Sequence, residues 1–200
     1  MGETALSPGY YALPPGMLAN VVTCLEMTAR PAVSAGLPAG YSLRPLARGD
    51  LAGFRALFSK VGRDWMWFSR LLMADEKLAG ILGDAKVESF ALQDGGQDVG
   101  ILELDFRGQP DCELSFFGLT KDAIGTGLGR ALMNEALARA WARPIARLWV
   151  HTCTFDHPAA LGFYRRSGFA PYKMMVEVHD DPRVSGKMPR DASPHVPLLP

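Results

Sequence analysis

The chain has 200 residues, 48% of them hydrophobic and 21% charged, a composition that fits one globular domain with a well-buried core. Its 21 acidic and 21 basic residues cancel, which excludes a bulk electrostatic attraction to nucleic acid or to an anionic membrane. No apolar run reaches the roughly 20 residues of a membrane span. Cys24, Cys112 and Cys153 form no CxxC pair, which argues against a disulfide framework or a zinc site. Because the first residues also lack the pattern of a signal peptide, we expect a cytoplasmic protein without a bound metal.

The first forty residues predict an arm that contains one strand. Residues 1–19 are rich in Pro, Gly and Tyr and show no period, and residues 30–40 form a Pro/Gly linker. Between them, Asn20–Met27 is short and β-branched, as strands are. A lone strand cannot satisfy its own backbone groups. We therefore expect Asn20–Met27 to pair with a sheet edge, in this chain or in a partner chain.

Residues 41–179 alternate strand and helix patterns. Tyr41–Leu46 alternates like a strand, and Leu51–Gly62 has apolar residues at helical spacing, with Asp50 as its predicted N-cap. After one or two short helices between 64 and 84, the predicted elements are strands at 86–93, 99–108 and 112–119, a long helix at 127–143, a strand at 146–152, a helix at 157–168 and a strand at 169–179. This order predicts a mixed α/β fold in which helices cover a sheet.

The chain from Asp180 onward is proline-rich and aperiodic, which leaves both an extended arm and a disordered segment open. The sequence thus divides into three parts. We expect an N-terminal arm with an extra strand over residues 1–40, one domain over 41–179 and a proline-rich C-terminal arm over 180–200.

Three glycines alternate with other residues at Gly125, Gly127 and Gly129, just before the predicted long helix. Glycine lets the backbone approach a ligand closely, and N–H groups at a helix start favour an anion. The spacing fits neither a dinucleotide fingerprint nor a P-loop, because Arg130 stands where a third glycine is needed and no Gly-Lys-Ser/Thr follows. The remaining alternative is a turn that only joins a strand to a helix.

A second motif, "HPAALGFYRRSGF", lies at His157–Phe169. The two motifs, in this order of strands and helices, resemble the GNAT superfamily of acyl-CoA-dependent N-acetyltransferases over about Tyr41 to Val178. The family's loop is usually Arg/Gln-x-x-Gly-x-Gly/Ala. Gly127 and Gly129 match it, whereas Ile124 replaces the leading Arg/Gln.

The family's later segment is roughly Asn-x-x-Ala-x-x-x-Tyr-x-x-x-Gly-Phe. Ala160, Tyr164, Gly168 and Phe169 match it, and His157 stands where Asn is usual. The resemblance implies the GNAT fold, a central mixed and mostly antiparallel sheet flanked by helices. It also implies a gap where the strand at 112–119 splays from the next one.

The resemblance identifies the anion as the pyrophosphate of acetyl-CoA, held by backbone N–H groups of the glycine loop. The strand before the loop would bind the pantetheine arm, and the acyl thioester would lie in the gap between the strands. The cofactor-binding residues that this implies are Leu119, Thr120, Gly125, Thr126, Gly127, Leu128, Gly129, Arg130, Ala131 and His157.

The attack of an amine on a thioester needs a base, an oxyanion donor and a proton for the departing thiolate. The family's tyrosine at Tyr164 faces the sulfur of CoA, and the donor would be the Leu119 backbone N–H. Glu113 is the candidate base: it lies six residues before Leu119 on the same strand, so we expect their side chains to share a face. Glu103 and His151 are alternative bases.

Three aromatic residues, Trp65, Trp67 and Phe68, either line an acceptor pocket or belong to the core. The function that the resemblance implies is the transfer of an acetyl group from acetyl-CoA to a primary amine by direct attack in a ternary complex. The alternative is a non-catalytic acyl-CoA-binding or regulatory module with the same fold, which Glu113 outside the cleft would favour. The sequence does not name the amine, and it leaves open whether the protein forms a homodimer.

Overall fold

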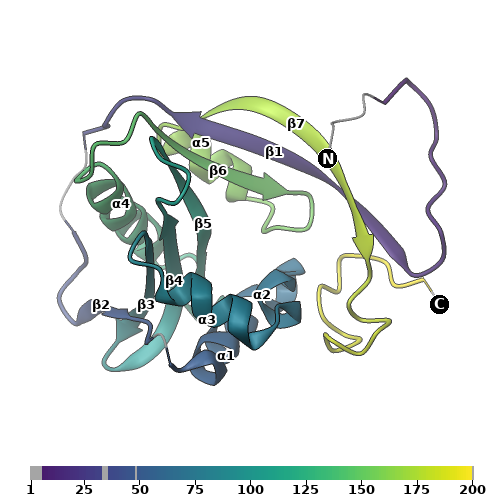
Figure 1. Cartoon of the computed structure of the whole chain (residues 1–200), viewed down its shortest axis with the longest axis horizontal. Helices are drawn as coiled ribbons and strands as arrows, with labels where there is room; N and C mark the ends of the chain where they lie inside the picture. The colour runs from purple at the N-terminus through teal and green to yellow at the C-terminus, as the bar shows by residue number, and fades with distance from the viewer. Residues whose placement is uncertain (1–5, 33–35, 48, 200) are drawn as a thin grey trace.

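The computed structural model describes residues 6–32, 36–47 and 49–199. These residues form one sheet of seven strands in the order β2-β3-β4-β5-β6-β1-β7 (Figure 1). The strands are β1 (Met17–Met27), β2 (Tyr41–Pro45), β3 (Val87–Asp94), β4 (Gln97–Asp105), β5 (Asp111–Leu119), β6 (Arg147–Cys153) and β7 (Ala170–Asp180). The α-helices are α1 (Leu51–Gly62), α2 (Ser69–Leu72), α3 (Asp75–Gly83), α4 (Leu128–Ala140) and α5 (Ala160–Arg166), and the short 3-10 helices are η1 (Arg63–Trp65) and η2 (Lys121–Ala123).

The sheet opens at one place. All neighbouring strands pair antiparallel except β5 and β6, which run parallel and pair only from Asp111–Glu113 opposite Arg147–Trp149. Beyond Glu113 the two strands diverge, so the second half of β5 has a free edge. The predicted mixed, mostly antiparallel sheet flanked by helices is confirmed.

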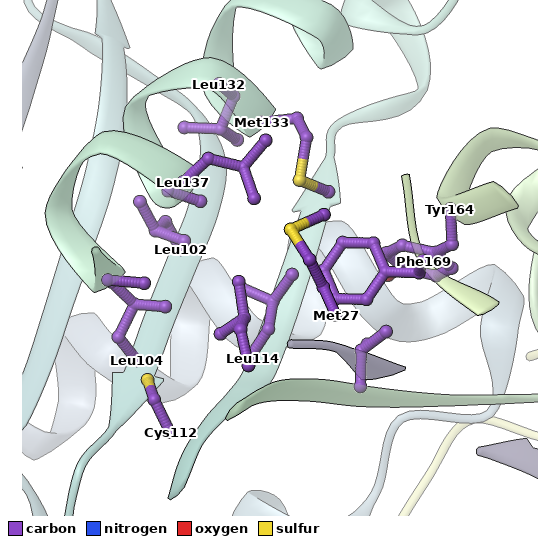
Figure 2. Close-up of a cluster of buried hydrophobic side chains, with 14 of the residues drawn as sticks. Met27, Leu102, Leu104, Cys112, Leu114, Leu132, Met133, Leu137, Tyr164 and Phe169 are labelled. Carbon is purple, nitrogen blue, oxygen red and sulfur yellow. The ribbon is translucent and has the colours of Figure 1, made fainter. Parts of the chain in front are cut away.

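Helices cover the sheet on two faces (Figure 1). On the face that we call the α1 face, α1 and α3 pack Phe54, Phe58 and Leu78 against Ala91 and Ile101 of β3 and β4. On the opposite face, the α4 face, α4 packs against β4 and β5, and the Tyr164 ring of α5 lies beside Phe117 of β5. Figure 2 shows part of that core, built from Leu102, Leu104, Cys112, Leu114, Leu132, Met133 and Leu137, with Tyr164 and Phe169 at one end beside Met27.

The strand β1 lies inside the sheet. It pairs antiparallel with β6, Val22 opposite Cys153, and with β7, Val21 opposite Val176. The predicted strand at Asn20–Met27 is therefore confirmed, and it begins three residues earlier than expected. It lies between two strands of its own chain and is hydrogen-bonded along both of its edges.

Residues 181–199, here called the C-terminal coil, are irregular and packed against the domain. The Arg183 side chain is buried, and its guanidinium donates to the Asp181 carboxylate at 2.8 Å and to the backbone oxygen of Val196 at 2.9 Å. Three coil residues, Met188, Ala192 and Val196, join a small core with Leu18, Met66 and Phe155. Neither alternative expected from the sequence describes this packed segment. The boundaries at residues 40 and 179 stay predictions.

Candidate active site

A cavity of about 770 Å³ runs through the gap between β5 and β6. Residues of both faces line it: the glycine loop and α5 from one side, and the segment from η1 to α2 from the other. Of the predicted site residues it is lined by Glu113, Leu119, Gly125, Gly127, Gly129, Arg130, His157 and Tyr164. Thr120, Thr126, Leu128 and Ala131 do not line it, and Thr120 and Leu128 are buried beside it.

The glycine loop leaves an open cradle at the start of α4. Gly125 and Gly127 have φ angles of +83° and +90°, which L side chains rarely adopt, and a Cβ on either would meet no atom within 4 Å. Gly127 is the N-cap of α4 and provides no side chain to accept from the first N–H groups of the helix. The loop therefore presents unsatisfied backbone donors and the positive end of the helix dipole to one opening.

The Leu119 backbone N–H points into the gap. Thr120 donates its N–H to the backbone oxygen of Val99 at 2.8 Å, and Leu119 lies opposite Gly100. Because hydrogen-bonded and non-bonded pairs alternate in an antiparallel ladder, the pair Leu119–Gly100 is non-bonded. The N–H of Leu119 is therefore directed away from β4, toward the side where β6 has diverged.

Glu113 and Leu119 do not share a face, and that sequence expectation is wrong. The register between β4 and β5 shifts so that Phe116 lies opposite Glu103 whereas Leu114 lies opposite Leu104. Ser115 is thus an extra residue, a β-bulge, which reverses the alternation after it. Leu119 packs in the core of the α4 face, and Glu113 lies on the α1 face.

The Glu113 carboxyl is partly buried beside other acids. Burial, and then the negative charges of Asp105 and Glu103, raise its pKa to about 7. Its Oε1 atom lies 4.0 Å from Nε2 of His151 on β6, which also lines the cavity. A carboxyl with this pKa exchanges a proton readily near neutral pH.

Glu103 is not placed to act as the base. Its side chain is fully buried, and its carboxylate accepts from Arg70 at 2.6 Å and from the Ser89 hydroxyl at 2.7 Å. Glu103 does not line the cavity. The pair with Arg70 instead ties α2 to β4 beneath the cavity wall.

Tyr164 is a buried residue of α5 that lines the cavity. Its ring packs edge-on against Phe117, Phe163 and Phe169, at centroid distances of 6.3, 5.8 and 5.9 Å. Burial, and then the charge of Asp156, raise the pKa of its hydroxyl above the ordinary value. The phenol therefore stays protonated and keeps its O–H as a hydrogen-bond donor.

The aromatic residues predicted either for a pocket or for the core line the cavity: Trp65, Trp67 and Phe68. The Nε1 atom of Trp67 donates to Asp156 at 3.2 Å. His157 lies beside Trp65, with the two ring centroids 4.9 Å apart. Its Nδ1 atom accepts from the Ala159 backbone N–H at 3.0 Å and so caps the first turn before α5.

Two cavity residues, Asp156 and Cys153, had no signal in the sequence. Asp156 accepts from the Thr152 hydroxyl at 2.7 Å and the Cys153 backbone N–H at 2.8 Å, in addition to Trp67. Burial, and then Asp156, raise the pKa of the Cys153 thiol to about 12, so this thiol is a poor nucleophile. Both residues lie where β6 ends in a turn, and no local pattern indicates the folded contacts of that turn.

The described part of the chain holds neither a membrane-spanning helix nor a metal-binding cluster. None of its helices is both long and apolar enough to cross a membrane. Nor do three or more His, Cys, Asp or Glu side chains gather in it as a metal ion would require.

A sheet split beside a glycine loop is the arrangement that the resemblance implied for an acyltransferase. The family model described as acetyltransferase (GNAT) family matches residues 54–169. That match covers more than half of the chain, so the protein belongs to the GNAT acetyltransferase family. A comparison with curated proteins finds no match.

Solved structures share the fold. The chain is similar to a GCN5-related N-acetyltransferase from Sphaerobacter thermophilus, with 16% identity, 82% of this chain and 52% of that chain covered, and a TM-score of 0.58. It is similar to an acetyltransferase from Thermus thermophilus, with 24% identity, 70% and 96% covered, and a TM-score of 0.51. It is also similar to a GCN5-related N-acetyltransferase from Kribbella flavida, with 18% identity, 86% of this chain and 63% of that chain covered, and a TM-score of 0.55. The chain thus spans about half the length of the first of these proteins.

Proposed function

We propose that the protein transfers an acetyl group from acetyl-CoA to a primary amine. The observation that carries this proposal is that one cavity joins the glycine loop, the free edge of β5, a carboxyl with a pKa near 7 and a buried tyrosine. Each has a chemical role in amide formation, and residues of both faces of the sheet line the cavity, as a ternary complex needs. A cytoplasmic location and a homodimer stay predictions.

The glycine loop fits the pyrophosphate of acetyl-CoA. Gly125 and Gly127 leave the loop without side chains where an anion would approach, and a Cβ on either would project into open space. The N–H groups at the start of α4 have no side-chain cap to compete with a phosphate. Arg130, whose guanidinium donates to the Ser167 hydroxyl at 3.1 Å, adds a positive charge beside the loop.

Three groups of the chain would carry the chemistry, and acetyl-CoA supplies the activated acetyl group. Glu113, as carboxylate, takes the proton of the attacking ammonium or amine through bridging water, because it lies six residues before Leu119 on β5. The Leu119 N–H stabilises the negative charge that develops on the carbonyl oxygen. Tyr164 donates its proton to the departing sulfur while the new C–N bond replaces the C–S bond.

Direct attack is favoured over an acyl-enzyme. Cys153 lines the cavity, but the pKa of its thiol is raised to about 12, so little thiolate exists near neutral pH. The alternative function, a non-catalytic acyl-CoA-binding module, would be favoured by Glu113 outside the cleft. Because Glu113 lines the cavity, we propose the enzyme.

The test measures CoA release from acetyl-CoA with a panel of primary amines, and confirms the N-acetylated product by mass spectrometry. We expect release that depends on the amine and that falls in Glu113→Gln and in Tyr164→Phe. Binding of acetyl-CoA without transfer to any amine would instead identify the binding module.

A further inference from the structure

The geometry points to the class of the acceptor: a primary amine that carries an aromatic body and no anionic group. This inference rests on the proposed function and deepens it. It follows from three properties of the cavity on the α1 face, namely a rigid aromatic wall, an amine-binding carboxyl across from it, and cations that are already paired.

The first property is the rigidity of the aromatic wall, in which the Trp67 side chain is closely packed. A Cβ on Gly62 would lie 2.3 Å from the Trp67 side chain, and one on Gly118 would lie 3.0 Å from its ring. Because neither glycine has a side chain, the Trp67 indole packs directly against α1 and β5. The Phe116 ring also contacts the indole, with a centroid distance of 5.4 Å. The hydrogen bond from Trp67 Nε1 to Asp156 fixes the orientation of the indole.

Trp65 belongs to the same wall and packs against the C-terminal coil. Its ring lies 4.9 Å from that of His157 and 5.8 Å from that of His195. The next residue, Met66, donates its backbone N–H to the Ser193 hydroxyl at 2.7 Å, and the Ser193 N–H donates to the Arg63 oxygen at 3.1 Å. The coil thus fixes the turn that carries Trp65, which makes the wall pre-organised for a flat ligand.

Phe68 extends the wall toward β7. Its ring lies 4.5 Å from the ring of His179, and both Phe68 and Trp65 are only partly buried, so their rings offer surface to a ligand. Aromatic pairs contribute beyond simple burial of area. A wall of this kind selects an aromatic amine over an alkyl amine of the same length.

The second property is the position of the amine. Glu113 and His151 line the same cavity from β5 and β6, on the α1 face and next to the gap. Because Glu113 lies on the face that carries the aromatic wall, an amine whose proton passes to Glu113 approaches the gap from the α1 face. Its carbon body then extends over the α1 face, where the aromatic wall lies.

The third property is the charge of the cavity. The two cations that line its α1 face are engaged: Arg70 pairs with Glu103 at 2.6 Å, and Arg107 pairs with Asp105 at 2.5 Å. Arg130 and Arg166 come from α4 and α5, on the other face. Glu113, Asp156 and Glu177 also line the cavity. A carboxylate or phosphate on the acceptor would lose its hydration without gaining a free cation.

The experiment compares four amines with the full-length protein and saturating acetyl-CoA. 2-Phenylethylamine is the reference, phenylalanine adds only a carboxylate, 2-cyclohexylethylamine removes only the aromatic character, and 1,4-diaminobutane replaces the ring by a second cation. We expect kcat/KM to be highest for 2-phenylethylamine, and at least about tenfold lower for phenylalanine because its carboxylate is left unpaired.

A pair of variants tests the wall itself. Trp65→Leu removes the ring, and we expect the kcat/KM ratio of 2-phenylethylamine to 2-cyclohexylethylamine to fall toward one. Trp65→Phe keeps an aromatic ring and should restore most of that ratio. Acetyl-CoA affinity, measured by calorimetry, reports whether each variant is folded.

Each outcome decides the matter. Turnover of phenylalanine, 1,4-diaminobutane or 2-cyclohexylethylamine as fast as that of 2-phenylethylamine would overturn the acceptor class and leave the acetyltransferase proposal standing. Binding of acetyl-CoA without transfer to any of the four amines, or to a wider amine panel, would overturn the acetyltransferase proposal and the acceptor class with it. Preference for 2-phenylethylamine that survives Trp65→Leu would overturn the role of the wall.

Discussion

The carboxyl of Glu113 and the imidazole of His151 approach each other to 4.0 Å across the gap between β5 and β6. Both side chains are partly exposed, so solvent screens their interaction. Their importance is chemical: a carboxyl whose pKa is raised to about 7 and an imidazole flank the site where an amine must lose a proton. The pH dependence of the reaction therefore reports which of the two acts as the base.

The rate should follow the ionisation of Glu113. Its raised pKa, about 7, means that the carboxylate needed for proton abstraction is lost as the pH falls through that value. We expect kcat/KM to rise with pH through about 7, and Glu113→Gln to lower it by about 10²-fold or more while removing this limb. Steady-state kinetics from pH 5 to 9 measure it.

His151→Asn provides the control for this profile. We expect the limb near pH 7 to remain in His151→Asn, with a modest shift. If the limb disappears in His151→Asn and persists in Glu113→Gln, the histidine is the base and our assignment is wrong.

The pH dependence of folding stability at Glu113 is opposite to that of the rate: stability falls where the rate rises. The pKa of Glu113 is higher in the folded protein than in an unfolded chain, so the folded state loses stability as the pH rises from about 4.5 through 7. Glu113→Gln should therefore raise Tm at pH 8 and change it little at pH 4. Scanning calorimetry at the two pH values checks the sign.

The glycine loop should be intolerant of side chains. Gly127→Val places a β-branched residue at φ +90° and in the opening of the loop, so acetyl-CoA affinity should fall at least about tenfold. Gly80→Val is the matched control, because a Cβ on Gly80 of α3 also meets no atom within 4 Å. Calorimetric titration of both variants that gave equal affinities would contradict the loop's role.

Tyr164→Phe should lower the rate of the chemical step and little else. The substitution keeps the ring packed among Phe117, Phe163 and Phe169 and removes only the hydroxyl. A positioned proton donor contributes about 10²–10⁴-fold, and a thiolate leaves easily, so we expect a decrease in kcat at the low end of that range. KM for acetyl-CoA should stay constant. Equal kcat, with chemistry shown to be rate-limiting, would remove Tyr164 from the mechanism.

The C-terminal coil should depend on Arg183. Without its guanidinium, the Asp181 carboxylate and several coil carbonyls lose their partner inside the protein. Removing one side of a buried ion pair typically costs about 3–5 kcal/mol, so Arg183→Met should lower Tm and expose residues 181–199 to proteases. Arg190→Met, at an exposed position of the same coil, is the control that should change neither.

The parts of the site that the sequence predicts are those that depend on local backbone geometry. Gly125 and Gly127 could be identified because a left-handed φ angle requires glycine, and the run from Asn20 to Met27 because β-branched residues favour strands. The bulge at Ser115 could not, since nothing in "CELSFFGL" distinguishes an extra residue from a regular one. The packing of the C-terminal coil was equally hidden, because Arg183 binds carbonyls that only the folded chain brings together.

The position of β1 determines how the chain must fold. This strand emerges early, yet its partners β6 and β7 lie more than a hundred residues later in the sequence. Pairings with so large a sequence separation require the closure of a long loop and slow the folding of a domain. Until β6 and β7 are available, the apolar residues of β1 stay exposed to solvent and to other chains. Completion of the sheet is therefore a late event, which joins the first strand of the chain to its last.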